Sequence, residues 1–181
     1  MKLNFKRAFD AIRRLGRSAE NKADDPVSLI LLLREPRFST LDQLRSAGER
    51  AFGIPFNGGK ESQHFVMQAA VLTIMKAGPH PLSFLNYTKP YGATDFPPEF
   101  ATAFPKANQR EAWTAHKAWT AVDYVGGGKN LKVEYGVLAA LCAEMIDTNC
   151  LALYEPREQT LIPNDGSLQQ ELKRRWGSRL T

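Results

Sequence analysis

The chain has 181 residues, 43% hydrophobic and 24% charged, a composition that excludes an intrinsically disordered protein and predicts one hydrophobic core. Its formal net charge is +5, and this excess arises in residues 1–18, which carry six basic residues and one acidic residue. The rest of the chain is balanced and has no overall field to attract a polyanion. Nucleic-acid binding is therefore not expected.

The cysteines and the apolar runs bear on the compartment. Cys142 and Cys150 offer no disulfide framework, so we expect a reducing, cytoplasmic environment. The longest uninterrupted apolar runs, Leu29–Leu33 and Val137–Ala143, fall far short of the roughly 20 residues that a membrane span requires. The sequence thus predicts a cytoplasmic protein that does not cross a bilayer.

Residues 1–20 predict a basic amphipathic helix, and residues 21–26 (NKADDP) a linker. Apolar residues recur between the basic ones at near-helical spacing: Leu3, Phe5, Phe9, Ile12 and Leu15. The apolar run is too short for a secretory signal. We expect this helix to dock on its own domain or on a dimer mate. A membrane surface or an acidic partner, bound through residues 1–18, is the alternative.

A strand and a helix follow the linker. Residues 27–33 (VSLILLL) are apolar at successive positions, which is typical of a strand covered on both faces. Thr40 and Gln43 have the spacing of a capping box, and the helix that they open should end at Gly53. Together they predict a β-to-α unit with clear boundaries.

The middle of the chain is less regular. Residues 64–68 and 70–76 predict two short extended segments, separate or paired as a hairpin. Residues 78–105 are rich in proline and aromatic residues without a sustained period. We expect a long loop there, and long loops in compact domains often carry binding sites.

The second half of the chain again shows regular patterns. The expected elements are a helix over 108–114, a strand over 116–125, a helix over 131–146, extended segments over 150–154 and 160–163, and a basic helix within 166–181. The helix over 131–146 has apolar residues in alternating steps of four and three, the stripe of a helix that lies on a sheet.

The order of these elements predicts the fold class. A strand, a helix and two strands are followed by a strand, a helix and a strand, which suggests two approximate βαβ halves. We predict a single α+β domain over residues 27–165, a ferredoxin-like two-layer sandwich with a mainly antiparallel sheet. Its helices should lie on one face, with further helices at the N- and C-terminal ends of the chain.

Four segments also resemble a known family. SLILLLREPRF, VLTIMKAGPHPLSF, AHKAWTAVDYVGGG and ALYEPREQTLIPND occur in the order seen in bacterial domain-of-unknown-function family number 4261. The resemblance extends over about residues 27–165 of this sequence. It implies a compact bacterial α+β domain with no established activity and therefore no catalytic residues to transfer. The aromatic middle loop departs from the family pattern.

The segment VDYVGGGKN places consecutive glycines between an expected strand and an expected helix. Free backbone N–H groups and the positive end of a helix dipole suit an anion. The candidate ligand-binding residues are Gly126, Gly127, Gly128, Lys129 and Asn130, with His116 and Tyr124 on the preceding strand. However, neither a Walker loop nor a dinucleotide fingerprint is present, and Asn130 fits a helix N-cap. A structural corner is the preferred interpretation and an anion site is the alternative.

Catalytic and metal chemistry find little support. His64, His80 and His116 lack the spacing of a zinc site, so we expect no metal and no cofactor. His116 is interpreted as a structural histidine, with a general base as the alternative. Both cysteines fall on expected core positions and should be inert. We name no catalytic residue and expect that the protein is not an enzyme.

The aromatic residues of the middle loop are the candidate partner-binding residues: Phe84, Tyr87, Tyr91, Phe96 and Phe100. Prolines alternating with aromatic residues pack a loop onto its own domain or onto a partner more often than onto nucleic acid. The sequence thus favours a non-enzymatic module that works by binding a protein partner or by self-association. A small anionic-ligand-binding domain or enzyme that uses the Gly126–Asn130 corner and His116 is the alternative.

Overall fold

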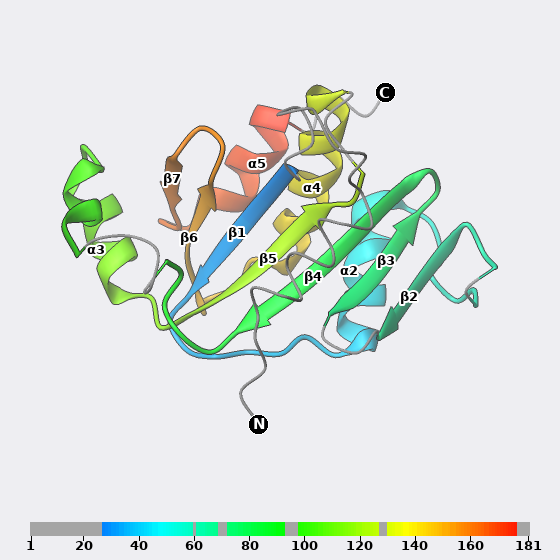
Figure 1. The fold of residues 1–181 in the computed structure, drawn as a ribbon. Helices are drawn as coiled ribbons and strands as arrows, with labels where there is room; N and C mark the ends of the chain where they lie inside the picture. The colour runs from blue at the N-terminus through cyan, green and yellow to red at the C-terminus, as the bar shows by residue number, and fades with distance from the viewer. Residues whose placement is uncertain (1–26, 60, 69–71, 93–97, 127–129, 177–181) are drawn as a thin grey trace, which may run out of the picture.

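A computed structural model describes residues 27–59, 61–68, 72–92, 98–126 and 130–176. The predicted amphipathic helix over residues 1–20 and the linker over residues 21–26 lie outside this part. The strands are β1 (Val27–Leu33), β2 (His64–Gln68), β3 (Thr73–Ala77), β4 (His80–Tyr87), β5 (Ala118–Tyr124), β6 (Cys150–Glu155) and β7 (Thr160–Pro163). They form one seven-stranded sheet in the order β2-β3-β4-β5-β1-β6-β7 (Figure 1).

Strand β1 lies inside the sheet, as its unbroken apolar run predicts. It pairs with β5 on one side and with β6 on the other, both antiparallel. Because side chains alternate along a strand, Leu29 and Leu31 point to one face while Ile30 and Leu32 point to the other. All four are buried, so both faces of the sheet are covered at this strand.

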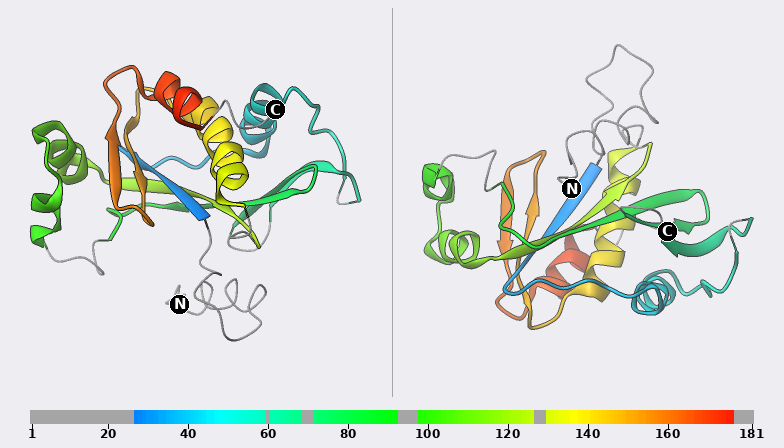
Figure 2. Two further views of the ribbon diagram at one scale, coloured as in Figure 1. Left: turned by 90° about the horizontal axis from the view of Figure 1, so that it is seen from above. Right: turned by 60° about the horizontal axis from the view of Figure 1, so that its bottom comes forward.

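The helices are α2 (Leu41–Phe52), α3 (Ala107–Ala115), α4 (Leu131–Met145) and α5 (Leu168–Trp176), with a 3-10 helix, η2 (Pro98–Ala103). Helices α2, α4 and α5 lie on the same side of the sheet (Figure 2). We call this side the front face, although it points away from the viewer in Figure 1. Helix α3 lies at the β6–β7 end of the sheet instead.

Local sequence sets the ends of α2. The Thr40 hydroxyl accepts the backbone N–H of Gln43, and the Gln43 side chain accepts the N–H of Thr40. Gly53 ends the helix at a φ of +68°, a left-handed conformation that glycine adopts without steric cost. The capping box predicted from the sequence is confirmed.

The front core is mainly aliphatic and joins the helices to the sheet. It includes Leu29, Leu31, Leu44, Phe84, Val122, Leu138 and Leu172. Helix α5 contributes buried residues at steps of four, and the ring of its Trp176 stacks on Tyr135 of α4 with 5.9 Å between centroids. The last helix is thereby fixed to α4.

A second core lies on the opposite, back face and is built around aromatic rings. We define the aromatic cluster as Tyr91, Phe100, Phe104, Trp113, Trp119 and Tyr154. Trp113 of α3 contacts the rings of Phe104 and Tyr154 at centroid distances of 5.2 Å. The cluster packs against back-face residues such as Ile30 and Leu32.

The structure confirms an α+β fold and corrects three expectations. The mainly antiparallel sheet is confirmed, but the ferredoxin-like two-layer layout is not, because the sheet has seven strands in the order β2-β3-β4-β5-β1-β6-β7. The expectation that helices cover one face only is wrong, since α3 packs on β6 and β7 through the aromatic cluster. The expected loop over 78–105 begins with strand β4 and later contains η2.

The strand prediction failed at β4 for a steric reason. Pro79 and Pro81 suggest an interruption, yet Gly78 has a φ of +62° and Pro79 fixes a negative φ after it. This is the sign pattern of a type II′ hairpin turn. The turn returns the chain so that Ala77 pairs with His80.

Candidate functional site

The segment Gly126–Asn130 after β5, which we call the glycine corner, leads into α4, and side chains of this chain bind backbone N–H groups at the start of that helix. Gly126 has a φ of +72°, which favours glycine, while Gly127, Gly128 and Lys129 lie outside the described residues. Asn130 caps α4, because its Oδ1 accepts the backbone N–H of Val133 at 3.3 Å. The structural interpretation of Asn130 is confirmed.

An acidic side chain already occupies this helix start. The Oε1 of Glu134 accepts the backbone N–H of Asn130 at 3.1 Å, and Glu134 is 4% exposed. A carboxylate in the first turn is favoured by the helix dipole. The same group repels an incoming anion, so this corner has lost part of the electrostatic advantage of a helix N-terminus.

Tyr124, the strand residue predicted beside the corner, has a partner that the sequence analysis missed. Its hydroxyl lies 2.7 Å from Nδ1 of His80. Burial lowers the pKa of His80, and burial together with the charge of Glu134 raises the pKa of Tyr124. Both groups are thus neutral at pH 7, and the tautomer of His80 decides which of the two donates. The Gly-Pro hairpin signal before His80 was the clue to this pairing.

His116 lies at the opposite end of β5 from the corner. Eight residues separate it from Tyr124 in the sequence, which corresponds to about 25 Å along a strand. Its Nε2 accepts the backbone N–H of Tyr91 at 2.8 Å, and its Nδ1 donates to the carbonyl oxygen of Trp113. Burial lowers the pKa of His116. Both ring nitrogens are engaged, so the structure does not bring His116 to the predicted anion site.

The predicted partner-binding aromatic residues are spread over the domain. Phe84 is 1% exposed and belongs to the front core. Tyr87 contacts Trp119, Tyr91 and Phe100 belong to the aromatic cluster, and Phe96 lies outside the described residues. The described members of this set face the interior of their own domain rather than forming one surface.

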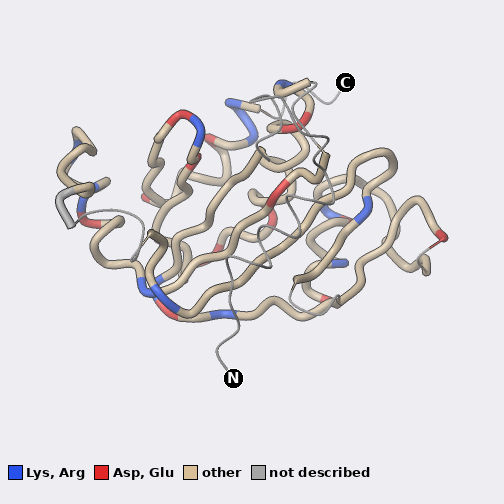
Figure 3. Tube along the Cα trace, viewed as in Figure 1, with Lys and Arg blue, Asp and Glu red and all other residues tan. Residues whose placement is uncertain are grey.

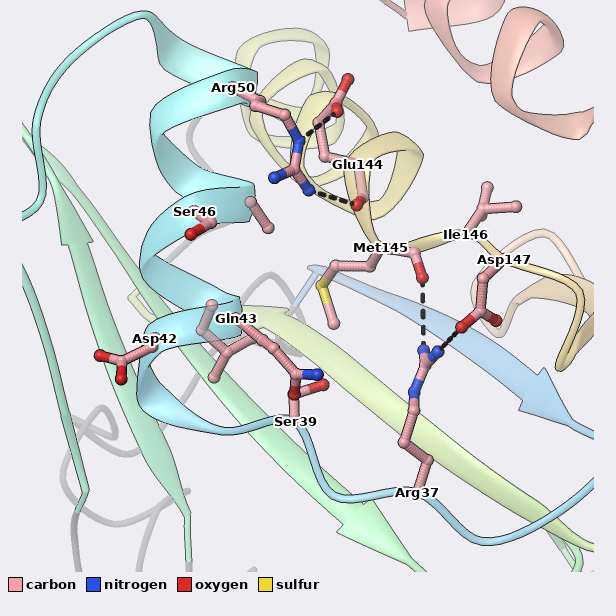
Figure 4. Close-up of a pocket in the computed structure, with 12 residues that line it drawn as sticks. Arg37, Ser39, Asp42, Gln43, Ser46, Arg50, Glu144, Met145, Ile146 and Asp147 are labelled. Carbon is pink, nitrogen blue, oxygen red and sulfur yellow. Dashed lines mark hydrogen bonds and ion pairs between the residues drawn. The ribbon is translucent and has the colours of Figure 1, made fainter.

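A groove lies between α2 and the C-terminal end of α4 (Figure 4). Its volume is about 380 Å³. The polar walls come from Arg37, Ser39, Asp42, Gln43, Ser46 and Arg50 on one side and from residues 144–147 on the other. We call it the α2/α4 groove.

Two arginines cross the groove and hold the end of α4. Arg37 pairs with Asp147 and donates to the carbonyl oxygen of Met145 at 3.3 Å. Arg50 donates to Glu144 Oε2 at 3.0 Å and to the carbonyl oxygen of the same residue at 3.2 Å. Cations at the last carbonyls of a helix are stabilising. The guanidinium groups therefore fix the distance between the walls.

Glu144 ties three helices together at the rim. Its carboxylate accepts from Arg50 of α2 and from Lys173 of α5, each at 3.0 Å. The hydrogen bond from Lys173 is the main cause that lowers the pKa of Glu144. The carboxylate therefore acts as a fixed structural anion and not as a proton donor at neutral pH.

Two features, one in the groove and one beside it, favour the binding of a partner. Within the described part of the chain, the buried Nε–H of Arg37 has no hydrogen-bond acceptor. The next residue, Phe38, is 65% exposed. A buried donor without an acceptor costs about 1–3 kcal/mol, and an exposed aromatic ring is a common anchor for a protein partner.

The two cysteine thiols are unsuited to nucleophilic catalysis. Burial raises the pKa of the Cys150 thiol to about 12 and also raises that of Cys142. Neither thiol is a nucleophile at neutral pH. Among the described residues, no group of three or more His, Cys, Asp and Glu side chains could hold a metal ion, and no helix is long and apolar enough to cross a membrane.

Comparisons with known proteins add no identity. No family model matches the chain, no curated protein matches it, and no solved structure matches it. The resemblance to family number 4261 therefore stays a prediction. Lys and Arg are interspersed with Asp and Glu over the described surface (Figure 3), in keeping with the balanced charge of the chain after residue 18.

Proposed function

We propose that this chain is a non-enzymatic association domain, which binds a segment of a partner protein in the α2/α4 groove. The observation that carries the proposal is the exposed ring of Phe38 next to a buried, unpartnered N–H of Arg37. One offers an apolar anchor and the other a hydrogen-bond donor, which together fix both the affinity and the register of a bound segment.

The groove favours binding over catalysis because of the state of its charged groups. Each arginine is paired with a carboxylate, and Glu144 has two cationic partners. The lining contains no histidine, cysteine or lysine, the usual general bases and nucleophiles. The hydroxyls of Ser39 and Ser46 have no such base beside them in this lining.

The lining also indicates the chemistry of the partner. Arg37, Gln43 and the two serines supply donors, while Leu44, Met145 and Ile146 supply apolar surface. The occupant that fits is an extended peptide segment with a carboxylate next to an apolar side chain. A volume of about 380 Å³ lies near the lower end of ligand pockets, so one or two partner side chains fill it.

The anion-binding alternative at the Gly126–Asn130 corner has weaker support. Glu134 places a carboxylate at the helix start, and His116 lies at the far end of β5. The pair formed by His80 and Tyr124 is neutral and attracts no anion. A cytoplasmic location and a protein partner remain our expectation for the association domain.

The test places a photo-reactive amino acid at Phe38 in the full chain and identifies the cross-linked segment by mass spectrometry. Phe38 is flanked in the sequence by the lining residues Arg37 and Ser39. The matched control carries the same group at Ile54, which is 38% exposed and follows the other end of α2. A synthetic peptide of the segment captured only from position 38 is then titrated against the purified protein.

The proposal requires that the peptide contain a carboxylate beside an apolar residue. It also requires that Ser46→Trp, which fills the groove, weaken binding at least tenfold while Ile54→Ser leaves it unchanged. Equal affinity of the Ser46→Trp variant would overturn the proposal. Capture of a second copy of this chain, or a retained small molecule in native mass spectra, would replace the partner segment by that occupant.

A further inference from the structure

The back face of the sheet carries apolar side chains at the end away from α3. Alternation and register place Phe65 and Met67 of β2, Ile74 of β3 and Leu85 of β4 on this face, because Met67 pairs with Ile74, Ile74 with Ser83, and Leu85 with the back-face residue Ala121. We call the back face of β2, β3 and β4 the open half.

The described elements leave the open half without a covering layer. Helices α2, α4 and α5 lie on the front face, and α3 lies beyond β7 (Figures 1 and 2). Phe65, Met67 and Ile74 belong to neither core cluster formed by described residues. Antiparallel sheets tolerate one solvated face, but then that face is polar. An apolar face calls for a partner layer.

The chain supplies a segment that starts at the right place. Twenty-six residues precede β1, and Val27, the first residue of β1, pairs with Tyr124, which in turn pairs with Leu82 of β4. From β1 to β3 there are three strand spacings, about 14 Å. The six residues of the 21–26 linker span up to about 20 Å. Strand β2 is one spacing further, about 19 Å from β1, so the segment before the linker can reach every strand of the open half.

The sequence of that segment matches the surface. Leu3, Phe5, Phe9, Ile12 and Leu15 give one apolar stripe with basic residues between them. A helix of 20 residues is about 30 Å long, enough to cross the strands. The front face is already filled by three helices, so the open half is the apolar surface left for this stripe.

The charges at the border of the open half favour the binding of a basic helix. Asp123 lies there, paired in register with Ser83, and its carboxylate accepts from Ser28 at 2.6 Å and from Ser83 at 3.5 Å. Lys76 also points to this face, and its long stem lets the ammonium group reach water. A helix over residues 1–20, with six basic and two acidic residues, complements the carboxylate.

We propose that residues 1–20 form an amphipathic helix that docks in cis on the open half and covers Phe65, Met67, Ile74 and Leu85. The arm is then the missing back layer of the sheet rather than a membrane anchor. The inference is independent of the α2/α4 groove, which lies on the front side.

The test uses the full chain with a single reactive cysteine at Ile12, made by Ile12→Cys and carrying a spin label. The native thiols of Cys142 and Cys150 are buried and do not compete for the reagent. Methyl signals of Met67, Ile74 and Leu85 should broaden most, and those of Leu44 and Leu138 on the front face should broaden least. Strongest broadening on the front face, or none on either face, would overturn the proposal.

Two controls separate the alternatives. Ile74→Lys puts a cation under the basic arm and should abolish the broadening, whereas Ile54→Lys on the front side should leave it intact. In a mixture of spin-labelled protein and isotope-labelled protein without the spin label, docking in cis produces no broadening. Broadening in that mixture would show that the arm docks on a second copy and would overturn the cis arrangement.

Discussion

The two halves of the back face are built in different ways. Near α3, rings from loop segments, from η2 and α3 and from two strands pack into one aromatic cluster over β1, β5 and β6. On β2 and β3, the apolar side chains of Phe65, Met67 and Ile74 project from the strands and belong to neither core cluster of the described residues. The comparison shows that internal segments complete one half of this face, whereas the described residues leave the other half without a covering layer.

The largest expected effect comes from removing the centre of the aromatic cluster. Trp113 contacts the rings of five neighbours. Trp113→Ala should lower the free energy of unfolding by about 3 kcal/mol, through lost contacts and a cavity. Denaturant unfolding measures this, with Phe38→Ala as the exposed aromatic control, expected within about 0.5 kcal/mol of the parent. A loss below 1 kcal/mol would show that the cluster is not a core.

A half-buried acid, Asp123 of β5, lies at the border of the open half, and its ionisation should be the next largest effect. Burial raises the pKa of Asp123 to about 6, although hydrogen bonds from Ser28 and Ser83 oppose the shift. The folded state therefore binds a proton that the unfolded state has released between pH 4 and 6. Stability should fall as pH rises through this window and stay lower above it.

Asp123→Asn removes that ionisation and keeps an acceptor for Ser28. We expect the variant to be more stable than the parent by about 1–2 kcal/mol at pH 8, a value reduced from the full shift by partial exposure, and equal to it near pH 4. Asp42→Asn, at an exposed ion pair, is the matched control. Denaturant unfolding curves at pH 4 and pH 8 measure both differences. If the parent were more stable than the variant at pH 8, the raised pKa of Asp123 would be wrong.

The titrating group of the aromatic half should act in the opposite direction and more weakly. Burial lowers the pKa of His116, so the unfolded state takes up a proton at a higher pH than the folded state. Stability should therefore decline as pH falls below 6.5. In the Asp123→Asn background, where the opposing titration is absent, adding His116→Gln should flatten this decline, whereas adding His64→Gln should not. An unchanged slope would remove His116 as its origin.

The sequence revealed the front layer better than the back one, for a physical reason. The stripe of α4, the cap at Thr40 and the apolar run of β1 are local periodic signals, and each predicted element is found. The aromatic cluster joins Tyr91, Trp113 and Tyr154, which are distant in sequence and follow no common period. Two of its members, Tyr91 and Phe100, were predicted to bind a partner, because periodicity cannot distinguish an exposed ring from one that packs on its own sheet.

The candidate site was less predictable than the fold. Tyr124 was identified, but its partner His80 depended on a hairpin turn whose prolines suggested a break. His116 was correctly placed at the start of the strand but was grouped with the glycine corner, which follows the other end of β5. The groove has no sequence signal at all. Arg37 precedes α2, and its partners Met145 and Asp147 lie more than a hundred residues later. Only the packing of α2 against α4 brings these side chains together.

The smallest expected effect tests whether the open half owes its stability to the arm. Phe9→Ser and Ile74→Ser should each lower the free energy of unfolding, Ile74→Ser only slightly because Ile74 is half-buried, and the two losses should not add. If Phe9 and Ile74 are in contact, the double variant should lose less free energy of unfolding than the two single variants together. The difference should be at least about 0.5 kcal/mol. The same cycle between Phe9→Ser and Phe38→Ser, on the front side, should be additive. Additivity in both cycles would mean that the arm does not contact the open half. The aromatic half of the back face would then be a core, and the open half a solvent-exposed apolar surface.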